Sequence, residues 1–426
     1  MPRTLSDDVH LVGDTLGRVL RTIGGEHVFE AVETMRRSAK AAREPDATPA
    51  ADDARRRLAE VADALPPEVA LEVVRAFTLY FQLVNVAEDV NRTRELRRRE
   101  VVDGPEAVAE SLAAAMQELA AGGATREAVL EALGSLRLGF VFTAHPTEAR
   151  RRTTERLLAE VRRGLERRDR EQLVPTEERR EERRLSATVE ALWQHGAERP
   201  ERPEVLEEVK AGLWYVEHVL LDVVPRLLRR LRAGLAAEFG PIDPLDVPPV
   251  VRFGSWMGGD RDGNPFVDDA VTERTLELHR RVAVDRYVRD VEALVDPLAA
   301  VDARLGPHPE LDAALARAEA AVPEIARATL ERNPREPLRR LLTFVRARLE
   351  RARDFAAGGY PDAHALLEDL VAMRSALVGA RATALADDLL LDLVHRVRVF
   401  GFHLLGLDVR EDSRVHRAVV AELLGD

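Results

Sequence analysis

The sequence predicts a predominantly α-helical α/β protein in which a few short parallel strands are separated by long helices. Three apolar runs, rich in β-branched and aromatic residues, lie near 138–144, 249–254 and 402–409. Each run is followed by polar or glycine-rich residues and then by a helical pattern. Parallel strands joined by helices bring their carboxyl ends to one edge, which is where β/α enzymes place their chemistry.

The residues before the first strand, 1–135, are expected to form an N-terminal helical region. Apolar residues recur there at helical spacing, as in Val69, Val73 and Phe77, and no strand pattern interrupts them. The remainder, 136–426, is expected to form strands with long helical insertions between them. The sequence therefore predicts a helical layer followed by a β/α region.

The composition excludes several classes of function. The chain is 46% hydrophobic and 32% charged, which is typical of a folded globular protein. It has no cysteine, so disulfides, thiolate metal sites and cysteine nucleophiles are excluded. The net charge of −12 argues against a nucleic-acid partner, whose phosphates need a surplus of cations. We find neither a membrane-spanning run nor a signal-peptide core, and so expect a cytoplasmic protein without a membrane partner.

The first candidate site is the end of the first strand. That strand is expected to be buried and to stop at His145, whose usual role in a site is proton transfer. Arg151 and Arg152 follow in the opening turn of the next helix, where the helix dipole disfavours cations, so an anion is expected there. The alternative is a core histidine beside a solvated basic helix, and this stretch alone does not separate the two.

The second candidate site is the loop after the second strand. Its glycines would allow a ligand to approach the backbone closely, and neither an EF-hand nor a phosphate-binding P-loop has this spacing. Trp256 could line an apolar pocket or plug the mouth of a barrel. A structural turn is the alternative for the loop as a whole. The candidate active-site residues here are Gly258, Gly259, Asp260, Arg261, Asp262 and Asn264.

The third candidate is Arg410, which follows the third strand directly. A guanidinium group at a strand end could bind a phosphate or carboxylate through its forked donors. The alternative is a salt bridge to Asp408 or Glu411.

Taken together, these motifs resemble those of the phosphoenolpyruvate carboxylase family. The histidine signature of that family is matched by Phe142-Thr-Ala-His-Pro-Thr-Glu148 with Arg151-Arg-Thr153. Its second hallmark is matched by Gly254-Ser-Trp-Met-Gly-Gly-Asp-Arg-Asp-Gly-Asn-Pro265. Further similarity runs from Gly25–Arg36 to Phe400–Ser413, so the resemblance extends along essentially the whole chain.

The resemblance implies a fold, a reaction and roles for the candidate residues. The fold would be a partial (β/α)8 barrel of the TIM type with many extra helices. The reaction would join phosphoenolpyruvate and bicarbonate to give oxaloacetate and phosphate, which is an anaplerotic supply to the tricarboxylic acid cycle. The enzyme would use Mg2+ or Mn2+ and would assemble as a homotetramer. His145 would be the catalytic histidine acting around carboxyphosphate. Trp256 would line the pocket for the methylene carbon of the substrate, and Arg410 would contact its phosphate. Arg151 and Arg152 would add to the positive electrostatic potential of the site.

The sequence departs from the family pattern in one large respect. The family's metal-binding carboxylates, later catalytic residues and allosteric acid site belong to its C-terminal half, and none of those motifs occurs here. We therefore expect no metal ligand in this chain, and we expect it to be an N-terminal part that is inactive alone. A non-catalytic helical remnant or scaffold is one alternative. A phosphotransfer protein that carries a stable phosphoryl group on His145 is another.

Overall fold

The computed structural model describes residues 3–42, 49–143, 152–170, 173–195, 204–262 and 264–425. The chain divides into two compact units, each made of two segments. Unit 1 contains Met1–Val108 and Arg150–Arg202, and unit 2 contains Ala109–Ala149 and Pro203–Asp426. The expected single boundary near residue 135 thus differs from the observed division, because helices on both sides of the first strand pack together in unit 1.

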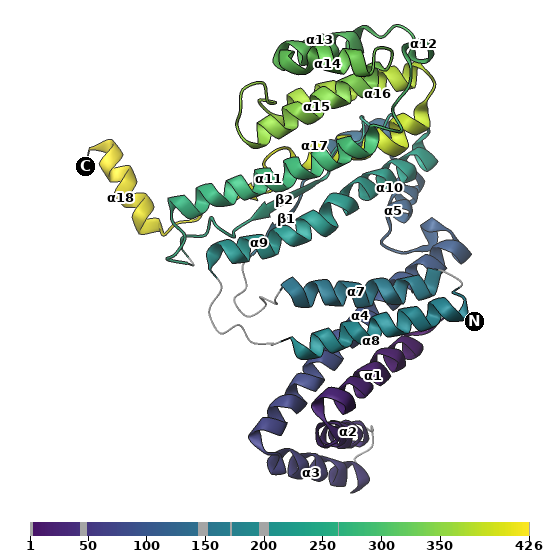
Figure 1. Ribbon diagram of the computed structural model, residues 1–426, viewed down its shortest axis with the longest axis vertical. Coiled ribbons are helices and arrows are strands. Elements are labelled where there is room, and N and C mark those ends of the chain that lie inside the picture. The colour runs from purple at the N-terminus through teal and green to yellow at the C-terminus, as the bar shows by residue number, and fades with distance from the viewer. Residues whose placement is uncertain are drawn as a thin grey trace. The chain divides into compact units, whose positions relative to one another are not determined.

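Unit 1 is entirely helical in the residues that are described (Figure 1). Its core is formed by apolar residues that recur at helical spacing, such as Val12 and Leu16, and by Leu83 and Val189 from other helices. Its elements are α1 (Leu5–Val19), the π-helix η1 (Leu20–Gly24), α2 (Glu26–Ala41), α3 (Pro49–Ala64), α4 (Pro67–Asp103), the 3-10 helix η2 (Pro105–Ala107), α7 (Arg152–Arg170) and α8 (Pro175–Gln194).

One helix of unit 1, α4, is long and apolar enough to cross a membrane when judged by length and composition alone. The expectation that no segment would pass this test was therefore wrong. However, Leu79, Leu83, Val86 and Val90 of α4 are buried in the core of unit 1. The core helix of a soluble protein passes the same test, so α4 is weak support for a membrane span.

Unit 2 contains all the strands that are described and most of the helices. Its first helices are α5 (Leu112–Ala121), α6 (Arg126–Ser135), α9 (Val205–Tyr215), η3 (Val216–Leu220) and α10 (Leu221–Phe239). The later ones are α11 (Asp269–Leu294), α12 (Asp302–Leu305), α13 (Pro309–Ala321), α14 (Pro323–Arg332), α15 (Pro337–Arg353), α16 (Ala363–Gly379), η4 (Leu385–Leu390), α17 (Leu391–Phe400) and α18 (Ser413–Leu424).

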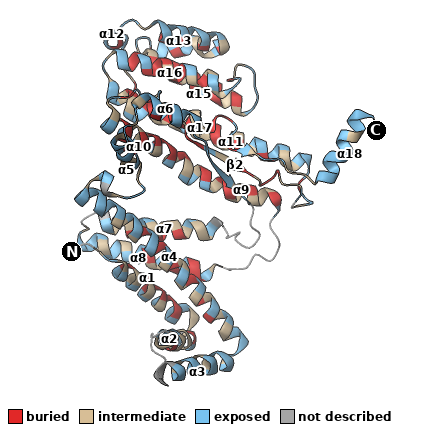
Figure 2. Cartoon of the chain, turned by 180° about the vertical axis from the view of Figure 1, so that it is seen from behind, coloured by how far each residue is buried: buried red, intermediate tan, exposed pale blue. Residues whose placement is uncertain are grey.

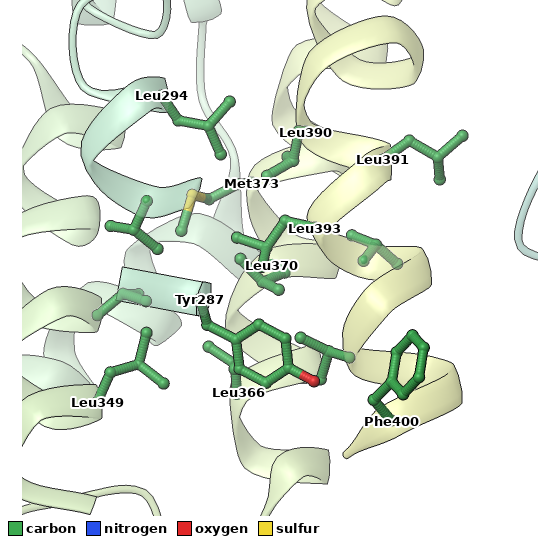
Figure 3. Packing of buried hydrophobic residues seen from close by; sticks show 14 of the residues in the cluster. Tyr287, Leu294, Leu349, Leu366, Leu370, Met373, Leu390, Leu391, Leu393 and Phe400 are labelled. Carbon is green, nitrogen blue, oxygen red and sulfur yellow. The ribbon is translucent and has the colours of Figure 1, made fainter. Parts of the chain in front are cut away.

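The core of unit 2 lies among α11, α15, α16 and α17. Figure 3 shows Tyr287, Leu349, Met373 and Phe400 packed together there, and all four side chains are fully buried. The buried faces of α15, α16 and α17 are visible in Figure 2, whereas α18 has no buried residue. The helical core therefore supports the sheet, while α18 contributes no buried residue to it.

The sheet consists of β1 (Leu138–Phe142), β2 (Val251–Ser255) and β3 (Gly406–Leu407), in that order. Both pairings are parallel, as expected, because helices separate the strands in sequence. The parallel register brings the carboxyl ends of all three strands to one edge. That edge carries the loop after β2 and the residues after β3.

Two expectations about the strands were wrong. The first strand is not buried: Phe140 is 55% exposed, because β1 pairs only with β2 among the described residues. The third strand is also shorter than the apolar run near 402–409. Residues before Gly406 form a turn instead, with positive φ angles of 52° at Gly401 and 59° at Leu404. This turn is stabilised because it buries Phe402 and Leu405 in the helical core.

Candidate functional site

The candidate site is the edge of the sheet where β2 and β3 end. Backbone hydrogen bonds continue the parallel ladder beyond both strands: the Asp408 N–H donates to the Ser255 carbonyl (3.0 Å), and the Arg410 N–H donates to the Gly259 carbonyl (2.9 Å). The Arg261 N–H then donates to the Arg410 carbonyl (2.8 Å). These bonds hold the loop after β2 directly against the residues after β3.

Two glycines shape the loop, and replacing either of them with any other residue would force neighbouring atoms to move. Gly258 has a positive φ of 81°, and a Cβ there would overlap the Thr275 hydroxyl on α11. A Cβ on Gly259 would lie 2.5 Å from the Asp408 carbonyl oxygen. The glycine pair therefore lets the loop pass between α11 and the end of β3, which fixes the side chains around it.

Trp256 is held by hydrogen bonds to the ends of both strands that flank β2. Its backbone N–H donates to the Phe142 carbonyl at the end of β1 (2.9 Å). Its indole Nε1–H donates to Oδ2 of Asp408 at the end of β3 (3.1 Å). The indole is thereby held in one orientation, partly exposed at the edge of the sheet.

Arg410 lies over this indole, with its guanidinium carbon 4.2 Å from the ring centroid. Its Nη1 lies 3.3 Å from Oδ2 of Asp260, and its Nη2 lies 3.2 Å from Oδ2 of Asp262. These are not the partners considered from the sequence, Asp408 and Glu411, although both of those residues are described as well. Two carboxylates and one aromatic face therefore orient the guanidinium group.

The guanidinium group retains the capacity to bind an anion. It has five N–H donors, and the two contacts with carboxylates are single and long. Its side chain is 38% exposed, so the remaining donors can reach a ligand. However, Asp260 and Asp262 together outweigh its charge, and Arg261 is paired with Asp269 (2.6 Å). Binding of a dianion at this position would need further cations.

The polar side chains of the loop differ in how far their hydrogen bonds are satisfied. Among the described residues, Oδ1 of Asp260 and Nε of Arg261 are buried without a hydrogen-bond partner. By contrast, Oδ1 of Asn264 accepts a hydrogen bond from the Phe266 N–H (3.1 Å), which closes the turn. The unmet acceptor on Asp260 gives this edge one polar group that a ligand or water could satisfy.

The other expected site residues are not placed by the structure. His145 and Arg151 lie outside the described residues. Arg152 is the first residue of α7, and its side chain is likewise outside them. The structure thus brings Trp256, Asp260, Asp262 and Arg410 together, with Gly258, Gly259, Arg261 and Asn264 shaping the same loop.

One contributor to the site was missed from the sequence. Asp408 was considered only as a partner for Arg410, but its carboxylate orients Trp256 instead. The signal was its place at the end of the third strand, two residues before Arg410. Predicting the contact would have required the register between β2 and β3, which the sequence does not display.

The described residues do not fit a divalent metal ion. They contain no group of three or more His, Asp or Glu side chains that could hold one. Asp260 and Asp262, the two carboxylates of the loop after Trp256, both contact Arg410. A cation would have to displace the guanidinium group to use them.

Comparison with known proteins relates the chain to one family. A family model described as phosphoenolpyruvate carboxylase matches residues 5–426. The phosphoenolpyruvate carboxylase of Roseiflexus castenholzii is 36% identical over 436 residues, covering 99% of this chain and 46% of the relative. That of Nocardia farcinica is 36% identical over 438 residues, covering 99% and 45% respectively. The chain spans about half the length of the curated relatives it matches.

Proposed function

Because the chain belongs to the phosphoenolpyruvate carboxylase family, we propose that it contributes to an enzyme that joins phosphoenolpyruvate and bicarbonate to form oxaloacetate and phosphate. One observation carries the proposal beyond family membership. Arg410 is held over Trp256 by Asp260 and Asp262 at the carboxyl edge of a parallel sheet. In this reaction, such a cluster would present a cation and an apolar ring to one substrate.

Arg410 would bind the phosphate group of phosphoenolpyruvate. Negative charge grows on that phosphate as its bond to the enol oxygen breaks, and a fixed guanidinium group stabilises the developing charge. The carboxylates of Asp260 and Asp262 would keep the guanidinium group in place before the substrate arrives, so less ordering is needed on binding. The ring of Trp256 would line the pocket for the methylene carbon, which has no polar group to solvate.

His145, Arg151 and Arg152 would supply what the described cluster lacks. By resemblance, His145 would act as the catalytic histidine around the carboxyphosphate intermediate, as a group that can gain or release a proton. Arg151 and Arg152 would provide the additional positive charge that a dianionic phosphate requires, since Asp260 and Asp262 outweigh Arg410.

Activity would need residues beyond these 426. The exposed apolar face of β1, with Leu138 at 44% and Phe140 at 55% exposure, is unusual for a strand and suits further strands of a barrel. The apolar residues of α18, including Leu423 at 80%, are similarly uncovered. We propose that the rest of the family's length covers both and supplies ligands for Mg2+ or Mn2+. The complete enzyme would be a cytoplasmic homotetramer.

A coupled assay for oxaloacetate tests this proposal. Purified residues 1–426 should form no oxaloacetate from phosphoenolpyruvate and bicarbonate. The same residues fused to the second half of the Roseiflexus castenholzii relative should form it. A folded fusion without activity would instead favour a non-catalytic remnant, and turnover by residues 1–426 alone would show that no further part is needed.

A further inference from the structure

Unit 1 contains a second candidate ligand site, formed by α1, η1, α2 and α4. These elements line an open pocket of about 720 Å3, a volume typical of small-molecule sites. All four elements belong to the same unit. The residues assigned above to the carboxylation reaction do not line it.

The pocket is strongly cationic in a protein whose net charge is −12. Its basic side chains outnumber the acidic ones by five to two. The acidic residues are Asp14 and Glu33. The basic residues are Arg18, Arg21, Arg36, Arg37 and Lys40. Concentrating cations in a concave surface attracts small anions and raises their local concentration.

Two of these cations are not paired with a carboxylate among the described residues. Glu33 accepts hydrogen bonds from Arg36 and Arg37, and the Arg36 contact is the main cause of its lowered pKa. Among the described residues, Arg18 and Lys40 have no carboxylate partner. Arg18 instead donates to the Thr15 hydroxyl (3.1 Å). At least two positive charges are therefore available to a ligand.

The wall between the cations is aromatic. Phe29 from α2 and Phe77 and Tyr80 from α4 line the pocket, and all three rings are only partly buried. Two glycines of α1, Gly13 and Gly17, face these rings: a Cβ on Gly13 would lie 3.7 Å from Tyr80. Both glycines line the pocket, so a side chain much larger than that of alanine at either position would extend into it.

We propose that this pocket binds a small organic phosphate, with the phosphate groups on Arg18 and Lys40 and a flat or apolar body against the aromatic rings. Guanidinium and ammonium groups both bind phosphate oxygens, and aromatic faces accept planar rings by stacking. The proposal concerns unit 1 alone and does not depend on the carboxylation reaction.

Binding can be measured by isothermal titration calorimetry with ADP, pyrophosphate and adenosine as probes. The purified chain should bind ADP or pyrophosphate saturably and should not bind uncharged adenosine. The double variant Arg18→Gln/Lys40→Gln should raise the Kd for the phosphate probes by a factor of at least about ten. Gly13→Leu, which fills the pocket without changing charge, should weaken ADP binding as well.

The matched control is Arg97→Gln/Arg99→Gln, which removes the same charge from exposed positions on α4 that do not line the pocket. It should bind as the unaltered chain does. Circular dichroism would establish that every variant remains helical. The proposal is overturned if neither ADP nor pyrophosphate saturates the chain at about 1 mM. It is also overturned if the Arg97→Gln/Arg99→Gln control loses as much affinity as the Arg18→Gln/Lys40→Gln variant.

Discussion

The guanidinium carbon of Arg410 lies 4.2 Å from the centroid of the Trp256 ring, although the long helical segment between β2 and β3 separates the two residues in sequence. A cation over an aromatic face is stabilised by about 0.5–1 kcal/mol at a partly exposed site. We therefore predict that the destabilisation of unit 2 by Arg410→Met and Trp256→Leu is non-additive, with a coupling energy of about that size. Urea unfolding of both single variants and the double variant measures this coupling, and strictly additive losses would contradict the contact.

The glycine loop provides a second prediction. Gly258→Ala should destabilise unit 2 by about 1–3 kcal/mol, because alanine disfavours the positive φ and its Cβ overlaps Thr275. The measurement is the urea midpoint followed by circular dichroism. Gly134→Ala on α6 is the matched control, since a Cβ there meets nothing within 4 Å. The control should be neutral or stabilising, and equal losses in the two variants would rule out a special role for the loop.

A buried ion-pair network in unit 2 leads to a third prediction. Asp369 is 1% exposed and contacts Arg348 (3.0 Å), Arg317 (2.9 Å) and the Tyr360 hydroxyl (2.8 Å). Asp369→Ala should cost about 3–5 kcal/mol of unfolding free energy, because it leaves the Arg348 guanidinium buried without a counter-charge.

The control for this network is the exposed ion pair of Asp302 and Arg335, in which Oδ1 of Asp302 lies 3.5 Å from Nε of Arg335. Asp302→Ala should change the unfolding free energy by less than about 1 kcal/mol. Denaturant unfolding of the two variants, carried out under the same conditions, compares their losses of unfolding free energy. A loss for Asp369→Ala no larger than the control's would mean that the buried network does not stabilise the helical core.

Stability should also depend on pH through a buried histidine. Burial lowers the pKa of His279 to about 4, below its ordinary value of 6.5. The unfolded chain therefore binds a proton that the folded chain does not, between those two values, and stability falls as the pH falls through this window. Between pH 7.5 and pH 5 the loss from His279 should be about 2 kcal/mol.

Denaturant unfolding at the two pH values tests this dependence. His279→Gln should reduce the pH dependence of the unfolding free energy, even if the variant is less stable at both values. His416→Gln, at an exposed position on α18, should leave the dependence unchanged. If the His279 variant keeps the full dependence, the acid sensitivity arises elsewhere; His395, whose pKa burial lowers to about 3, is the next residue to test.

The sequence predicted the features that depend on local pattern. The positions of β1 and β2 followed from short apolar runs, and the loop at 256–264 followed from its glycines. Contacts between distant segments could not be predicted in the same way. The pairing of Arg410 with Asp260 and Asp262 depends on the register between β2 and β3, and the exposure of Phe140 depends on which strands lie beside β1. Burial of His279 likewise depends on how α11 packs.

We propose that the strand ends of this chain form part of a phosphoenolpyruvate carboxylase site. The most direct test is the rate of oxaloacetate formation by the fusion with the Roseiflexus castenholzii half, compared with its His145→Asn and Arg410→Gln variants. We predict that His145→Asn abolishes turnover while the fold is retained, and that Arg410→Gln chiefly raises KM for phosphoenolpyruvate. Near-normal turnover by His145→Asn, together with an unchanged KM for Arg410→Gln, would contradict the claim.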